Sequence, residues 1–127
     1  MTERLTAISL FSGAGGLDIG LEDVGFDVRV AVDVNPYACE TLRANRWLGE
    51  ATASQFDKWF ARVASQRCYR NWGTVEIELL RNRIRVGVGQ HSYLRRAAII
   101  EADIRQLSSD TLLEAGNCKR GDIDLVF

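Results

Sequence analysis

Apolar and polar positions near the start of the chain predict parallel strands connected by helices. Residues 5–11 are mostly apolar, residues 17–24 carry apolar side chains at helical spacing before Gly25, and residues 28–34 are rich in valine. Asn35 can cap a second helix and Pro36 can occupy its first position, so this helix is expected to run to about Trp47. Two strands joined through a helix imply parallel pairing.

The middle of the chain admits two interpretations. Residues 53–68 predict a helix, because their large apolar side chains share one stripe. This stripe consists of Phe56, Trp59, Phe60 and Val63. Apolar and polar residues alternate over 74–79 and over 83–88, which favours a β-hairpin with Arg81 and Asn82 between its strands, whereas a continuous helix is the competing interpretation.

Two further segments complete the predicted sheet. Residues 97–100 predict a third parallel strand, and residues 122–127 predict a buried fourth strand. The expected fold class is α/β, with a mainly parallel sheet, an inserted helix and a hairpin. A parallel sheet must be covered on both faces, and no helix follows residue 127, so the domain is expected to be incomplete.

Composition and charge narrow the class of protein. The chain has 127 residues, of which 46% are hydrophobic and 26% charged, so one folded domain is expected. Residues 46–101 hold ten Lys and Arg against five Asp and Glu, yet the whole chain carries a net charge of −1, which excludes a strongly basic nucleic-acid binder. Neither a membrane span nor a signal peptide is visible, so a cytoplasmic location without membrane association is expected. Three widely spaced cysteines predict neither disulfides nor a metal site.

A glycine-rich segment lies between the first strand and the first helix. Residues 12–16 read Ser-Gly-Ala-Gly-Gly, and glycines at this junction let the backbone turn tightly and approach a ligand closely. A turn needed only for the path of the chain is the alternative interpretation. Asp33, twenty residues after Gly13 at the end of the second strand, favours a nucleoside site, because its carboxylate can accept both ribose hydroxyls. Asp103 follows the third strand and would reach the same crevice, or would cap the next turn.

These segments resemble the motifs of the cytosine carbon-5 DNA methyltransferases. Residues 10–17 (LFSGAGGL) are similar to the first motif of that family, and residues 31–39 (AVDVNPYAC) to the second. Residues 102–104 (ADI) resemble the third motif, and residues 124–127 (DLVF) the opening of the fourth. The resemblance implies a three-layer Rossmann-like methyltransferase fold, with residues 1–45 as its cofactor-binding core, 46–98 as a basic insert and 99–127 as its third and fourth strands.

The resemblance also implies a cofactor, S-adenosylmethionine, and its contacts. Asp33 would hold the ribose, Val34 would pack on the adenine face, and Asp103 with Ile104 would frame the adenine edge. The methionine and adenosine side would be bound by Phe11, Ser12, Gly13, Ala14, Gly15, Gly16 and Leu17.

One departure from the family concerns catalysis. The family continues from the fourth strand into a Gly-Gly-Pro-Pro-Cys-Gln loop whose cysteine attacks cytosine, and Cys39, Cys68 and Cys118 do not lie in such a motif. The resemblance therefore implies a DNA methyltransferase that is inactive as 127 residues alone. Its catalytic and target-recognition parts would be missing by truncation or supplied by a second polypeptide. Whether the methylation serves restriction protection or regulation is left open.

Two alternatives are weighed against this interpretation, and a separate hypothesis concerns the basic insert. A non-catalytic subunit that binds S-adenosylmethionine would share the same cofactor residues. A dinucleotide-dependent oxidoreductase would need a third glycine at position 18, where this chain has Asp18. In the basic insert, Arg81, Arg83 and Arg85, together with Arg95 and Arg96, could contact DNA phosphates, although a solvated face is the favoured interpretation.

Overall fold

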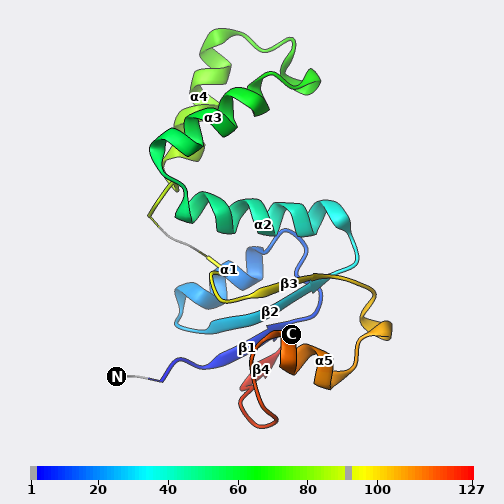
Figure 1. Ribbon diagram of the computed structural model, residues 1–127. Coiled ribbons are helices and arrows are strands. Elements are labelled where there is room, and N and C mark those ends of the chain that lie inside the picture. Colours follow the sequence, from blue (N-terminus) through cyan, green and yellow to red (C-terminus); the bar gives the residue numbers. More distant parts are fainter. Residues whose placement is uncertain (1–2, 91–92) are drawn as a thin grey trace. The chain divides into compact units, whose positions relative to one another are not determined.

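The computed structural model describes residues 3–90 and 93–127, which divide into two compact units (Figure 1). The first, called the sheet unit, comprises Met1–Arg46 and Tyr93–Phe127, and the second, called the helical unit, comprises Trp47–Ser92. Helix α2, Pro36–Glu50, begins in the sheet unit and ends in the helical unit. None of the helices in the described ranges is both long and apolar enough to cross a membrane.

A four-stranded, all-parallel sheet forms the centre of the sheet unit. Its strands are β1 (Thr6–Ser9), β2 (Asp27–Asp33), β3 (Ala98–Glu101) and β4 (Leu125–Val126), in the order β3-β2-β1-β4. All three pairings are parallel, so the carboxyl ends of these strands meet at one edge. The expected α/β, Rossmann-like architecture is thereby confirmed.

Two hydrophobic clusters, one on each face of the sheet, make three layers. On one face Leu42 of α2 packs with Ala7, Val28 and Ala31 of the sheet. On the other face Leu112 of α5 (Ser109–Ala115) packs with strand residues of β1 and β2, so α2 and α5 lie on opposite sides (Figure 1). The valine-rich run thus contributes side chains to both clusters.

The two first helices begin as their sequences predict. Helix α1, Gly16–Asp23, starts directly after the glycine-rich turn and ends before Gly25, which has φ +101°. Helix α2 is capped by Asn35, whose Oδ1 accepts the backbone N–H of Tyr37 at 2.9 Å. This helix continues to Glu50, three residues beyond the expected end.

The predicted β-hairpin in the helical unit is wrong, and the competing helix is correct. Residues Thr74–Arg85 form α4, which follows α3 (Ala53–Ala64) and a short 3₁₀ helix η1 (Arg67–Tyr69). Glu76 accepts the backbone N–H of Gly73 at the start of α4, and Arg83 and Arg85 lie in its last turn, where positive charge is favourable. The apolar residues Ile77, Leu80 and Ile84 also repeat at helical spacing. The same segment therefore fits both the alternation of a strand and the period of a helix.

The last strand is shorter and more exposed than expected. Only Leu125 and Val126 pair with β1, and Val126 is 55% exposed. The expected burial over 122–127 is therefore wrong for this residue, because β4 has only β1 as a neighbour among the described strands.

Candidate functional site

A cavity of about 470 Å³ opens at the carboxyl edge of the sheet, where ligands of parallel α/β folds bind. The ends of β1, β2 and β3 each contribute to its wall. The lining residues are Leu10, Phe11, Asp33, Val34, Ala102, Asp103, Ile104 and Arg105. Five residues singled out by the sequence, from three separate segments, therefore line one cavity.

Asp33 joins the second strand to the glycine-rich turn. Its Oδ2 accepts the backbone N–H of Gly13 at 2.8 Å, and its Oδ1 accepts the backbone N–H of Asn35 at 2.8 Å. Each carboxylate oxygen can accept about two hydrogen bonds, so each keeps one acceptor position. The half-buried carboxylate is thus held by backbone groups while it can still accept two further donors.

The glycine-rich turn adopts a backbone that its glycines make accessible. Gly13 has φ +53° and Gly15 has φ +87°. A Cβ atom on Gly15 would lie 2.6 Å from Cδ2 of the buried Leu42, so this glycine also allows the turn to pack closely on α2. The turn residues Ser12, Gly13, Ala14, Gly15, Gly16 and Leu17 are not among the cavity-lining residues, and their cofactor contacts stay a prediction.

Asp103 lies at the cavity and also caps the turn that follows it, while its predicted contact with a ligand stays a prediction. It lines the cavity, and it also caps the 3₁₀ helix η2 (Ile104–Gln106), where its Oδ1 accepts the backbone N–H of Arg105 at 2.9 Å. The preceding Ala102 donates its N–H to the carbonyl of Asp33 at 3.0 Å, which ties the third strand end to the second. The Arg105 guanidinium binds the Asp103 carboxylate and holds the pKa of that carboxyl below its ordinary value.

The sequence interpretation missed three lining residues. Leu10 and Ala102 immediately precede predicted site residues. Their positions next to these residues at the ends of strands could therefore have identified them. Arg105 follows Asp103 by two positions, the spacing at which a capping side chain meets its own turn.

A buried carboxylate lies beneath the same turn. Asp18, in the first turn of α1, is fully buried, and Ser12 Oγ lies 3.4 Å from its Oδ1 while its Oδ2 has no hydrogen-bond partner among the described atoms. Burial of such a group costs free energy, and the positive end of the α1 dipole offsets part of that cost.

The cysteines are poorly suited to nucleophilic catalysis in this structure. Burial raises the pKa of the Cys39 and Cys118 thiols, which disfavours the thiolate. Cys68 is exposed in η1 of the helical unit. None of the three lines the cavity at the carboxyl edge of the sheet.

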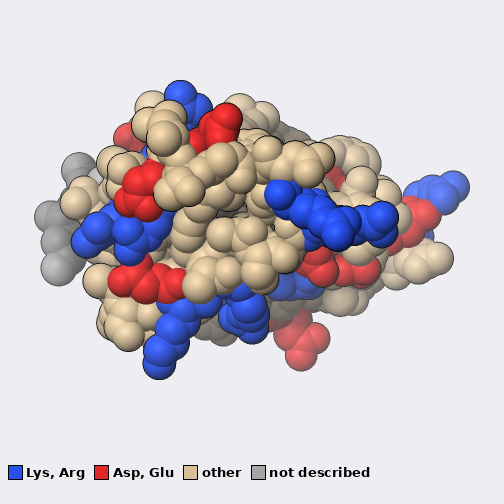
Figure 2. Space-filling model, turned by 90° about the horizontal axis from the view of Figure 1, so that it is seen from above, with Lys and Arg blue, Asp and Glu red and all other residues tan. Residues whose placement is uncertain are grey.

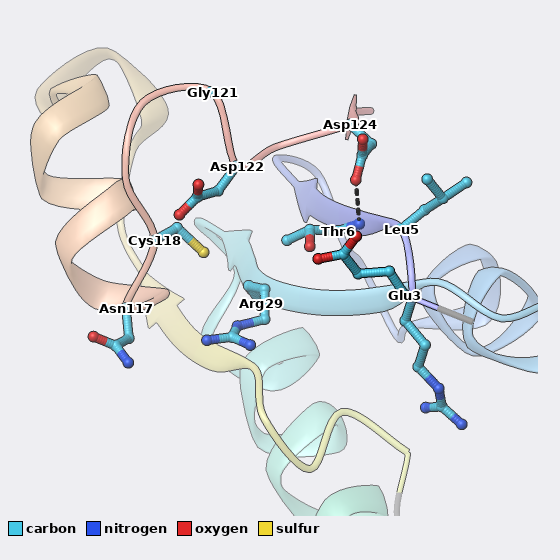
Figure 3. A pocket seen from close by; sticks show the side chains of 10 residues that line it. Glu3, Leu5, Thr6, Arg29, Asn117, Cys118, Gly121, Asp122 and Asp124 are labelled. Carbon is cyan, nitrogen blue, oxygen red and sulfur yellow. Dashed lines mark hydrogen bonds between the residues drawn. The ribbon is translucent and has the colours of Figure 1, made fainter. Parts of the chain in front are cut away.

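A second cavity, of about 490 Å³, lies at the opposite edge of the sheet. Its lining includes Thr6 at the start of β1, Arg29 of β2 and Asp124 just before β4, and Figure 3 shows the bond of 2.7 Å from Thr6 N to Asp124 Oδ2. Parallel α/β sheets bind ligands at the carboxyl edge, so the first cavity is the candidate site.

The arginines proposed as a phosphate-contacting face do not form one alternating surface. Arg81 binds Asp57 at 2.6 Å and Glu78 at 3.3 Å, and Arg96 binds Asp27 at 3.1 Å. On the face shown in Figure 2, basic side chains lie in separate groups with acidic side chains among them. Since residues 83–88 are not a strand, the alternation that grouped Arg83 with Arg85 is absent.

Comparisons with known proteins find similarity in the first part of the chain. Residues 5–59 match the family described as C-5 cytosine-specific DNA methylase. The chain is 60% identical over 38 residues to the Type II methyltransferase M.AquIA of Picosynechococcus sp., a stretch that covers 30% of this chain and 15% of that protein. It is 49% identical over 41 residues to the Type II methyltransferase M1.HphI of Haemophilus parahaemolyticus, covering 32% and 11% respectively.

A longer stretch of similarity is found with a third relative. The chain is 42% identical over 55 residues to the Type II methyltransferase M.Eco47II of Escherichia coli, which covers 41% of this chain and 13% of that protein. The matches thus span at most 15% of the length of these three relatives. No solved structure matches the chain. The resemblance of the first two motifs is confirmed, whereas residues 102–104 and 124–127 lie outside the matched family region.

Proposed function

We propose that the chain belongs to the C-5 cytosine-specific DNA methylase family, which its residues 5–59 match, and that the sheet unit binds S-adenosylmethionine for methylation of cytosine in DNA. The cofactor supplies a methyl group that is activated for transfer by a sulfonium. The observation that carries the proposal is the meeting of Phe11, Asp33 and Asp103 at one cavity of about 470 Å³.

The donor set of the cavity fits a nucleoside. Asp33 keeps one acceptor position on each carboxylate oxygen, which suits the two hydroxyls of a ribose. Val34 and Ile104 add apolar side chains to the lining of the cavity, which suits the faces of a purine ring. Asp103 supplies a further acceptor for a ring substituent, and the turn residues 12–17 would bind the methionine side.

The chemical step needs groups that these 127 residues do not provide. Cys39 and Cys118 have raised pKa values, and Cys68 lies in the helical unit, so we assign none of them to the attack on cytosine. We propose that the attacking cysteine and the target-recognition residues lie in another part of the polypeptide or in a second polypeptide. The 127-residue chain by itself is then expected not to methylate DNA.

Calorimetric titration of the full chain with S-adenosylhomocysteine tests the proposal. The chain is expected to bind this product and to bind NAD more weakly. Asp33→Asn is expected to weaken binding about 10- to 100-fold, because hydrogen bonds to a charged acceptor are lost. Asp110→Asn, which changes an exposed carboxylate of α5 paired with Arg120, is the matched control and should leave the affinity unchanged. Preference for NAD, or equal affinity in the Asp33 variant, would contradict the assignment.

A non-catalytic role for the same cofactor site is distinguished by complementation. We expect methyl transfer to DNA to appear when the chain is mixed with a polypeptide that carries the family's cysteine loop and target-recognition part. Retained binding of S-adenosylhomocysteine without restored transfer would favour a binding subunit that has lost its catalytic role.

A further inference from the structure

Arg105 makes a two-pronged contact with Asp103 at the rim of the candidate site. Its Nη2 donates to Asp103 Oδ2 at 2.5 Å, and its Nε lies 3.0 Å from both Oδ1 and Oδ2. Both residues line the cavity, and the Arg105 side chain is 86% exposed while that of Asp103 is 24% exposed. The guanidinium therefore binds a carboxylate that belongs to the lining of the cavity.

These contacts nearly fill the acceptor capacity of the carboxylate. Oδ1 accepts the backbone N–H and Nε of Arg105, whereas Oδ2 accepts Nη2 and shares the Nε hydrogen. Since each oxygen accepts about two hydrogen bonds, one acceptor position is left, on Oδ2. A side-on arginine also fixes the plane of the carboxylate, because its donors form a rigid fork.

A carboxylate fixed in this way distinguishes a donor from an acceptor at one position. An exocyclic amino group of a purine offers an N–H to the remaining position on Oδ2, whereas a 6-oxo group presents a lone pair to a negative oxygen. A freely rotating carboxylate could turn to accept the ring N–H of a 6-oxopurine instead. A carboxylate fixed by Arg105 cannot turn to accept this ring N–H.

We propose that Arg105 is a positioning residue that leaves Asp103 with a single, fixed acceptor and thereby selects a 6-amino purine over a 6-oxo purine in the site. The inference rests on the proposed function, because it takes the ligand to be a purine nucleoside derivative. Arg105 acts through Asp103 and needs no contact with the ligand itself.

The test compares two ligands on the full chain by calorimetry: S-adenosylhomocysteine and its 6-oxo analogue, S-inosylhomocysteine. Arg105→Gln is expected to weaken binding of the 6-amino ligand about 5- to 10-fold and to change binding of the 6-oxo ligand less than about 2-fold. Arg105→Lys keeps the charge but loses the fork, so it should discriminate as poorly as Arg105→Gln. The matched control is Arg120→Gln, which breaks an exposed pair with Asp110 at 2.9 Å outside the cavity and should leave both affinities unchanged.

The outcomes separate this inference from the function on which it rests. If the unaltered chain binds neither ligand, the proposed function and the role of Arg105 both fall. If the unaltered chain binds S-adenosylhomocysteine and both Arg105 variants keep its preference for the 6-amino ligand, only the role of Arg105 falls. Tighter binding by Arg105→Gln would likewise overturn it, because the arginine would then compete with the ligand. A general loss of folding would lower both affinities together, so the ratio of the two affinities reports positioning alone.

Discussion

The contacts that stabilise the sheet unit differ from those that stabilise the helical unit. In the sheet unit, buried side chains lie on both faces of a parallel sheet, and backbone hydrogen bonds connect segments far apart in the sequence. Among the described residues of the helical unit, the fully or nearly fully buried side chains are Ala51, Phe56 and Phe60. The rings of Trp47 and Trp59 also meet, tilted by 48° with 5.8 Å between their centroids. A few aromatic contacts thus replace an extended core. Sites with fixed geometry are expected on the sheet unit, where contacts from several strands and helices fix the position of each buried residue.

Removal of one aromatic side chain is the most severe test of this contrast. Phe56→Ala is expected to destabilise the helical unit by about 3–5 kcal/mol, because Phe56 is fully buried and is a large part of a small core. In heteronuclear NMR spectra of the full chain, signals of residues 53–85 should collapse toward unfolded positions while those of the strands persist. Binding of S-adenosylhomocysteine should also persist.

Leu42→Ala is the corresponding change in the sheet unit. Leu42 is fully buried against the sheet and beneath Gly15, so its loss should cost about 2–5 kcal/mol and weaken ligand binding as well. If Phe56→Ala instead removed the strand signals or ligand binding, the two units would be one cooperative structure.

A smaller effect is expected from a single methyl group in the glycine-rich turn. Gly15→Ala places a Cβ 2.6 Å from Leu42 Cδ2 and requires φ +87° of an alanine, so we expect a loss of about 2–4 kcal/mol in urea unfolding. Gly20→Ala is the control: its Cβ would meet nothing within 4 Å, and an alanine inside α1 should stabilise by about 0.5–1 kcal/mol. Equal effects of the two substitutions would show that the turn does not need its left-handed backbone.

The sequence predicted the first part of the sheet unit because local and long-range requirements agree there. Asn35 and Pro36 start a helix by capping and by ring geometry, and the helix they start also delivers Leu42 to the core. Residues 74–88 were harder, since their apolar positions satisfy both a period of two and a helical period. Packing between α3 and α4 and the bond from Arg81 to Asp57 favour the helix, and neither is visible in a local pattern.

The candidate site, like the fold, was predicted in part from the sequence. Asp33 and Asp103 were found because carboxyl ends of parallel strands meet at one edge, a rule that needs only strand order. The bond from Gly13 to Asp33 agrees with that rule. Arg105 was missed because an arginine in a short exposed turn has no distinguishing pattern, and its contact with Asp103 depends on the conformation of η2.

The smallest expected effect concerns a carboxyl group of the sheet unit that is not in the cavity. Glu22 of α1 accepts the backbone N–H of Leu94 at 2.8 Å, yet burial raises its pKa above the ordinary value of 4.5. Burial therefore outweighs that hydrogen bond, and the folded chain takes up this proton more readily than the unfolded chain. Stability is accordingly lost as pH rises from about 4.5 through the higher folded pKa.

Glu22→Gln removes the charge and keeps an oxygen for the Leu94 N–H, so this variant should lack the loss at rising pH. We expect the free energy of unfolding of the variant, relative to the unaltered chain, to be higher at pH 7 than at pH 4, by less than about 1 kcal/mol. Urea unfolding at the two pH values measures the difference, with Glu114→Gln on the exposed face of α5 as the control. A relative stability that falls between pH 4 and pH 7 would mean that the Leu94 bond, rather than burial, dominates at Glu22.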